Sequence, residues 1–97
     1  MCDRAECIAK LKDAVPYIRK EFGVTGLAIF GSMARGDNHP DSDVDIIVDM
    51  PPEIFLMSAL KEYLEHLLKT SVDLIRRHSH LSQRFLNQIS DDAIHIL

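Results

Sequence analysis

Residues 31–48 read Gly-Ser-Met-Ala-Arg-Gly-Asp-Asn-His-Pro-Asp-Ser-Asp-Val-Asp-Ile-Ile-Val, and this stretch joins a small-residue turn to two carboxylates that enter an apolar strand. Gly31 and Ser32 directly follow another apolar, partly β-branched run, so they fall where a strand ends and the backbone turns tightly. Such a turn presents backbone N–H groups to an anion. Strand alternation places Asp43 and Asp45 on one face, with Cα atoms roughly 6.6 Å apart. The stretch therefore predicts a phosphate cradle beside a divalent-metal site, the pairing that phosphoryl or nucleotidyl transfer requires.

The motif resembles the signature of the minimal nucleotidyltransferases of the DNA polymerase β superfamily, which is Gly-Ser, a short variable loop, and Asp-x-Asp or Asp-x-Glu on a strand. The matching positions are Gly31, Ser32, Arg35, Gly36, Ser42, Asp43, Asp45 and Val48. The family also uses a third carboxylate on a later strand, and Asp73 lies inside a second β-like apolar run. The resemblance covers essentially the whole chain and extends to the MntA-type antitoxins of HEPN/MNT toxin–antitoxin pairs.

The resemblance assigns a role to each motif residue. Three carboxylates are expected to be both catalytic and metal-binding, together holding two Mg²⁺ ions: Asp43, Asp45 and Asp73. The backbone of Gly31 and Ser32, with the Ser32 hydroxyl, would bind the β- and γ-phosphates of the nucleotide. Arg35 would add a charge-assisted contact to the triphosphate. The alternative for Arg35 is a surface ion pair with Asp37 or Asp41.

Other interpretations of the acidic motif fit less well. An EF-hand loop would need Gly where the chain has Ile46 and a bidentate Glu where it has Pro52. A dehalogenase-type phosphatase places its nucleophile directly after a hydrophobic strand, whereas Asp43 follows a polar loop. A solvated acidic turn explains the loop itself, because Gly, Asn, Pro, Asp and Ser favour turns. It does not explain two carboxylates at the start of an Ile-Ile-Val strand, where β-propensity disfavours Asp.

The order of the expected elements indicates an α/β (α+β) fold. Amphipathic helices are predicted over residues 4–22 and 53–69, strands over 25–30, 43–49, 71–76 and 93–97, and short helices over 32–35 and 81–89. Pro16 predicts a kink or a division of the first helix. This order predicts a mixed β-sheet with helices packed mainly on one face, and the resemblance implies the polymerase β-like nucleotidyltransferase core. The 97 residues fit a single nucleotidyltransferase domain over residues 1–97.

Composition limits the partners and the location. Fifteen acidic and eleven basic side chains give a net charge of −4, which argues against broad nucleic-acid binding. No apolar run approaches the roughly 18 residues of a membrane span, and no signal peptide is evident, so a cytoplasmic protein with no membrane association is expected. Cys2 and Cys7 form no disulfide or metal framework and are expected to be reduced thiols. The five histidines offer no complete ligand set.

Three functions remain open at this level. The first is a Mg²⁺-dependent nucleotidyltransferase that moves a nucleoside monophosphate, with AMP from ATP as the expected transfer, to a hydroxyl group. By resemblance, that hydroxyl belongs to a tyrosine of a helical HEPN-type toxin partner, and the chain is its antitoxin. The second is a non-catalytic antitoxin or regulatory subunit that acts by binding alone. The third is the catalytic subunit of a small-molecule nucleotidyltransferase. The repelling carboxylates on one strand favour catalysis, because a protein that only binds its partner has no reason to keep them.

Overall fold

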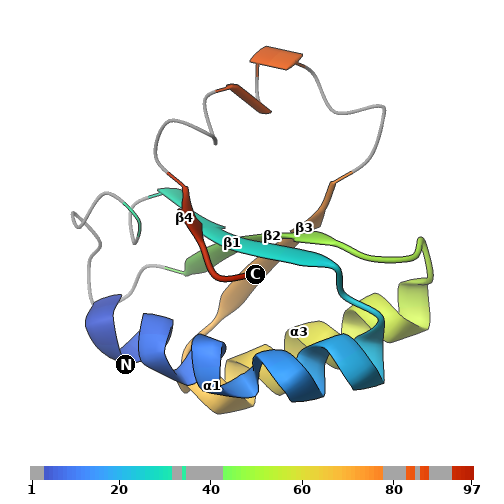
Figure 1. Cartoon of the computed structure of the whole chain (residues 1–97), viewed down its shortest axis with the longest axis horizontal. Coiled ribbons are helices and arrows are strands. Elements are labelled where there is room, and N and C mark those ends of the chain that lie inside the picture. The colour runs from blue at the N-terminus through green and yellow to red at the C-terminus, as the bar shows by residue number, and fades with distance from the viewer. Residues whose placement is uncertain (1–3, 32–33, 35–42, 78–82, 85, 88–92) are drawn as a thin grey trace.

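The computed structural model of the chain describes residues 4–31, 34, 43–77, 83–84, 86–87 and 93–97. In chain order, the elements are α1 (Arg4–Phe22), β1 (Gly26–Phe30), β2 (Val44–Asp49), α3 (Ile54–Leu68), β3 (Val72–Arg76) and β4 (Ile94–His95). The strands form one sheet in the order β3-β2-β1-β4, in which β1 is antiparallel to β2 and β4, and β2 is parallel to β3. Figure 1 shows α1 and α3 together below the sheet. The prediction of a mixed sheet with helices on one face is confirmed.

Helix α1 has the predicted bounds, and its buried residues follow helical spacing: Cys7, Leu11, Ala14, Ile18 and Phe22. It ends at Gly23, whose φ of +66° is a conformation that glycine adopts without a Cβ clash. Pro16 lies inside the helix and does not divide it, so that part of the prediction is wrong. Pro16 and Lys12 are both exposed. In a helix the Lys12 carbonyl would accept the backbone N–H of residue 16, which proline lacks. Because this side of α1 is exposed, water can bind the carbonyl instead.

Cys7 differs from the expected reduced thiol. Its side chain is completely buried, and the residue is disulfide-bonded. Cys2 lies outside the described residues. The first turn of α1 therefore carries a covalent link that the two-cysteine pattern did not predict.

Helix α3 connects the two parallel strands across the sheet. It begins after Pro51 and Pro52, with Glu53 as its N-cap residue, and ends at Leu68, followed by the C-cap residue Lys69 with a φ of +56°. The helix is one residue shorter at each end than predicted. Its fully buried residues are Leu60, Leu64 and Leu68, and burying each such side chain contributes roughly 1.5–3 kcal/mol.

The sheet has a different environment on each face. On one face, Val44, Ile46 and Val48 pack with α1 and α3 in the main core. On the other face, Ala28 and Ile47 form a small second cluster that also contacts Phe30, Ile75, Leu86 and Ala93. Because side chains alternate along a strand, the acidic residues of β2 lie on the face of Ile47, away from both helices.

The remaining elements are short. Strand β4 forms within the predicted range 93–97 and lies at an edge of the sheet. Gln83, Arg84, Leu86 and Asn87 are helical, in agreement with the predicted helix over 81–89, whose other residues lie outside the described part. The predicted helix over 32–35 is described only at Ala34, which is helical and buried.

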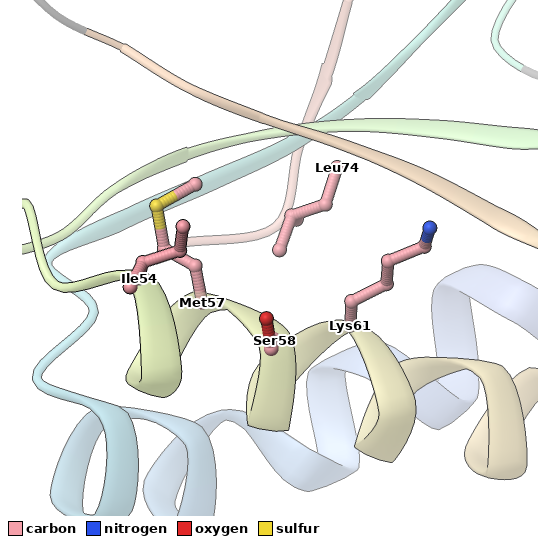
Figure 2. A pocket seen from close by; sticks show the side chains of 5 residues that line it. All are labelled: Ile54, Met57, Ser58, Lys61 and Leu74. Atoms are coloured by element: carbon pink, nitrogen blue, oxygen red, sulfur yellow. The ribbon is translucent and has the colours of Figure 1, made fainter.

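Two further features concern surfaces. A hollow of about 180 Å³ opens between α3 and β3 and is lined by Ile54, Met57, Ser58, Lys61 and Leu74 (Figure 2).

Among the described residues, no helix has both the length and the apolar character needed to cross a membrane.

Candidate active site

The register of the sheet brings together three motif segments that are far apart in the sequence. Asp45 of β2 lies directly beside Asp73 of β3 in the parallel pair. On its other side, Asp45 lies opposite Phe30, the last residue of β1. Gly31 follows Phe30, and neighbouring strands are about 4.8 Å apart. The turn and two of the predicted carboxylates therefore meet at one end of the sheet.

Gly31 is required at its position for two separate reasons. Its φ is +72°, a left-handed conformation that is unfavourable for residues with a side chain. A Cβ atom at Gly31 would also collide with the Asp45 carboxylate. Gly23 has a similar φ, but a Cβ there would make only an ordinary contact with Pro51 at 3.5 Å. The Asp45 carboxylate thus lies against the backbone at the start of the turn.

The three predicted carboxylates differ in exposure. Asp43 is exposed just before β2, Asp45 is half-buried within β2, and Asp73 is exposed within β3. Asp45 and Asp73 alternate with core residues of their strands, so both lie on the sheet face that α1 and α3 do not cover. A substrate can reach these side chains without displacing either helix.

The donor set suits Mg²⁺ that is shared with a substrate. In the described part of the chain, no group of three or more His, Cys, Asp or Glu side chains is placed to hold a metal by itself. Asp45 and Asp73 nevertheless supply carboxylate oxygens from adjacent positions. Mg²⁺ is usually bound by one or two carboxylates together with substrate phosphates and water. The residues therefore fit a Mg²⁺ site that a nucleotide would complete, and both the Mg²⁺ and the number of ions stay predictions.

Two of the predicted nucleotide-binding residues, Ser32 and Arg35, lie outside the described residues. Their proposed contacts with the triphosphate stay predictions. Gly31, the first residue of the predicted phosphate cradle, follows the end of β1 and lies next to Asp45.

Residues 9–95 of the chain match the family described as the nucleotidyltransferase domain. The chain belongs to this family. "Protein adenylyltransferase MntA" of Thermococcus cleftensis is 45% identical over 64 residues, which are 64% of this chain and 65% of that protein. A "Putative protein adenylyltransferase" of Methanocaldococcus jannaschii is 35% identical over 85 residues, which are 81% of this chain and 99% of that protein. The prediction of a nucleotidyltransferase enzyme is confirmed.

Solved structures confirm the fold of this nucleotidyltransferase. A structure described as a "putative minimal nucleotidyltransferase" has a TM-score of 0.80 and 30% identity, and the alignment covers 97% of this chain and 96% of that one. A second similar chain belongs to a complex of the tri-AMPylated Shewanella oneidensis HEPN toxin with MNT antitoxin. Its TM-score is 0.64 at 17% identity, with 93% of this chain and 71% of that chain covered. The predicted polymerase β-like nucleotidyltransferase fold is therefore correct.

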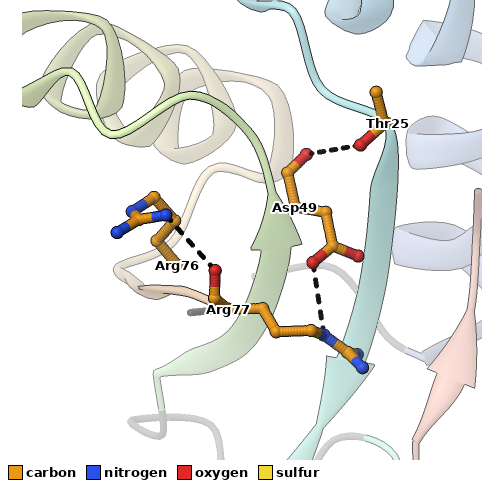
Figure 3. A network of polar contacts seen from close by, with 4 residues as sticks. All are labelled: Thr25, Asp49, Arg76 and Arg77. Atoms are coloured by element: carbon orange, nitrogen blue, oxygen red, sulfur yellow. Dashed lines mark hydrogen bonds and ion pairs between the residues drawn. The ribbon is translucent and has the colours of Figure 1, made fainter. Parts of the chain in front are cut away.

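The opposite end of the nucleotidyltransferase sheet holds a polar network that the sequence did not predict (Figure 3). Arg77 Nε lies 3.3 Å from Asp49 Oδ1 as an ion pair, and the Arg77 N–H donates to the Val48 carbonyl at 2.7 Å. The Asp49 carbonyl accepts the Thr25 N–H at 2.8 Å and the Thr25 hydroxyl at 3.3 Å. The Arg76 Nη1 donates to the Arg77 carbonyl at 3.4 Å. The network joins β1, β2 and β3 at the end of the sheet opposite Gly31, Asp45 and Asp73.

Proposed function

We propose that this nucleotidyltransferase transfers AMP from ATP, with Mg²⁺, to a tyrosine hydroxyl of a helical HEPN-type partner and thereby acts as its antitoxin. The adjacency of Asp45 to Asp73 and to Gly31 carries the proposal. The protein adenylyltransferase names of two relatives support the AMP transfer. The similar chain in a complex that contains an AMPylated HEPN toxin supports the partner. A cytoplasmic location is part of the proposal, because ATP is the donor.

The proposed reaction is an in-line displacement at the α-phosphorus. The tyrosine oxygen forms a new P–O bond, the bond between the α-phosphorus and the bridging oxygen breaks, and pyrophosphate leaves with that oxygen. The phenol proton would pass to a nearby carboxylate and then to water, and we assign the first step to Asp73, whose side chain is exposed. The backbone N–H groups of the predicted cradle, Gly31 and Ser32, would orient the departing phosphates. Mg²⁺ held by Asp43, Asp45 and Asp73 with phosphate oxygens would supply charge stabilisation.

A protein acceptor agrees with the charge of the chain. The net charge of −4 disfavours a polynucleotide acceptor, which would be attracted by a basic surface. Exposed Asp73 lies on the face that α1 and α3 leave uncovered, so a side chain of a bound protein can approach it. ATP and a HEPN-type protein are therefore the two proposed partners.

The test compares two isosteric variants of the same strand. The HEPN-type protein that co-purifies with the chain is incubated with α-labelled ATP and Mg²⁺, and its intact mass is measured. The wild type and the control Asp49→Asn are expected to add one or more AMP units to a tyrosine. Asp45→Asn is expected to add none, because it removes a ligand of the metal and leaves the strand intact.

Two outcomes would replace the proposal. If no adduct forms and Asp45→Asn neutralises the partner as well as the wild type does, the chain is a binding antitoxin without catalysis. If the label leaves ATP but appears on a small molecule instead of the partner, the chain is a small-molecule nucleotidyltransferase.

A further inference from the structure

The edge of strand β3 that faces away from β2 carries backbone N–H and C=O groups that can form further hydrogen bonds. The Val44 N–H donates to the Ser71 carbonyl at 3.0 Å and the Arg77 N–H to the Val48 carbonyl at 2.7 Å, which fixes the parallel ladder. In such a ladder alternate residues bond to one neighbour, so the backbone groups of the even-numbered residues, Leu74 among them, point away from β2. Within the described residues, no strand pairs with this edge.

Glu65 of α3 already uses one end of the edge. Its Oε2 accepts the Val72 N–H at 3.0 Å. The open backbone groups therefore begin with the Val72 carbonyl and continue through Leu74 and Arg76. This length suits an extended segment of about three to five residues.

The hollow between α3 and β3 lies beside that open edge. Its lining is mainly apolar, from Ile54, Met57 and Leu74, and Figure 2 shows these side chains pointing into the same space. Its volume is about 180 Å³, and it opens to the solvent, so a side chain of a bound segment can enter it from outside. Ile54 is 73% exposed, an unfavourable position for a large apolar side chain.

Lys61 adds a charge to the rim of the hollow. It is exposed and has no ion pair or hydrogen bond with any part of the chain that the structure describes. An occupant that brings a carboxylate near the hollow would therefore gain a partner for this ammonium group. Open backbone groups, an apolar hollow and the ammonium group of Lys61 therefore lie within the length of one short strand.

We propose that an extended segment of the acceptor protein pairs with β3 as an additional strand, placing an apolar side chain in the hollow and a carboxylate near Lys61. The proposal rests on the proposed function and adds how the acceptor binds. Strand addition of this kind takes its affinity from backbone hydrogen bonds and its specificity from pockets for alternate side chains.

The register predicts where the acceptor hydroxyl lies. A residue paired with Leu74 directs its side chain toward α3, into the hollow, because paired residues share a face. The neighbouring residue, paired with Asp73, directs its side chain to the opposite face, where Asp73 and Asp45 lie. The acceptor tyrosine is therefore adjacent in sequence to the apolar anchor residue.

A second copy of this chain fits the edge poorly. An antiparallel β3–β3 pair centred on Leu74 would bring the Lys61 residues of both copies together, and like charges at close range are unfavourable. Glu65 would also occupy the Val72 N–H in both copies, which removes one backbone bond at each end of the pair.

The experiment measures binding of three fluorescein-labelled peptides in the absence of nucleotide. The test peptide carries Glu-Thr-Leu-Tyr-Thr-Glu at its centre. One control replaces the leucine by serine, and the other inserts threonine between leucine and tyrosine, which moves both side chains to the same face. Fluorescence anisotropy gives each dissociation constant for the whole chain. We expect the test peptide to bind, and each control to bind roughly tenfold more weakly or worse.

Matched variants of the protein test the hollow. Ile54→Asp is compared with Phe55→Asp, which changes another largely exposed apolar residue of the same helical turn that does not line the hollow. Lys61→Glu is compared with Lys12→Glu on α1. We expect the first member of each pair to weaken peptide binding roughly tenfold and the second to leave it within about twofold.

Amide hydrogen exchange tests the strand pairing directly. Saturating peptide is expected to slow exchange most at the amides of Leu74 and Arg76, which face outward and gain a hydrogen bond, and less at Asp73 and Ile75, which already bond to β2. Three results would overturn the proposal: no binding of the test peptide, equal binding to Ile54→Asp and the wild type, or unchanged exchange at Leu74. A dimer in sedimentation that already protects Leu74 would assign the edge to self-association instead.

Failure of this proposal and failure of the proposed function give different results. If the peptide binds as described but receives no AMP when ATP and Mg²⁺ are added, and the HEPN-type protein receives none either, the proposed function fails and the docking site stands. If the HEPN-type protein is adenylylated equally by Ile54→Asp and the wild type, the docking site fails and the function stands.

Discussion

Replacing Gly31 with alanine is expected to damage both stability and transfer, because the new methyl group meets the Asp45 carboxylate. The cost has two parts. A left-handed φ of +72° costs an alanine roughly 1–2 kcal/mol. Displacing the carboxylate to make room for the methyl group adds roughly 1–3 kcal/mol, as overpacking typically does. The total, roughly 2–5 kcal/mol, is less than the stability of many domains of this size, so the variant can be studied folded.

Gly23→Ala separates the two parts. Gly23 has a φ of +66°, close to that of Gly31, and a Cβ there has room beside Pro51. Both variants lose the same glycine flexibility in the unfolded chain, so this contribution cancels in the comparison. Gly23→Ala is therefore expected to lose only the conformational part, roughly 1–2 kcal/mol, and to keep full transfer activity.

Urea denaturation gives the unfolding free energy of each variant, and label transfer from α-labelled ATP gives activity. Gly31→Ala is expected to lose roughly 100-fold in rate, because a displacement of about 1 Å at a catalytic group can cost that much. A double-mutant cycle with Asp45→Ala should return a coupling energy of roughly 1–3 kcal/mol, since removing the carboxylate removes the clash. Equal stability and activity of Gly31→Ala and Gly23→Ala would refute the contact between Gly31 and Asp45.

Changing Asp43 and Asp45 together to Asn is expected to abolish transfer and to leave the unfolding free energy in EDTA equal or slightly higher, because a like-charge repulsion is removed; marked unfolding would make these residues structural. Arg77→Met is expected to lower the unfolding free energy, measured by urea denaturation, by less than about 1 kcal/mol, because both partners of its ion pair with Asp49 are about 40% exposed. A decrease above about 2 kcal/mol would contradict this. Burial raises the pKa of Tyr63 above 10.0, so the folded protein holds this proton more tightly than the unfolded chain. Stability should therefore decline as the pH rises from 10 through the folded pKa, and less steeply in Tyr63→Phe; identical pH profiles would exclude this contribution.

Local patterns predicted most of the elements. The bounds of α1 follow from apolar residues at helical spacing and from the glycine at its end, and both signals act within a few residues. The prediction that Pro16 divides the helix failed. The rule that proline interrupts helices accounts for the lost backbone hydrogen bond but not for the exposure of that position to solvent. The exposed side of α1 lets water replace that bond, so the helix continues.

The residues of the predicted site could be named from the sequence, but only the resemblance to the family indicated that Asp73 lies near Asp45. Gly31, Asp43 and Asp45 follow from one continuous motif. The position of Asp73 beside Asp45 depends on the strand order and on the length of α3, neither of which a single segment specifies. The pairing of Arg77 with Asp49 depends on the same register and for that reason was missed. The hollow beside β3 arises from how α3 packs on the sheet, so no sequence motif marks it.

The strand order gives the two principal carboxylates different local stabilities. Asp45 lies on a strand with neighbours on both sides, whereas Asp73 lies on a strand with one neighbour among the described residues. Edge strands open locally at a lower free energy than central strands. Opening of β3 alone would remove Asp73 and leave Asp45 against Gly31, so the proposed metal site can come apart while the antiparallel β1–β2 pair stays intact. A segment that pairs with β3 would raise the free energy of this opening, and an acceptor bound there would stabilise the site that modifies it.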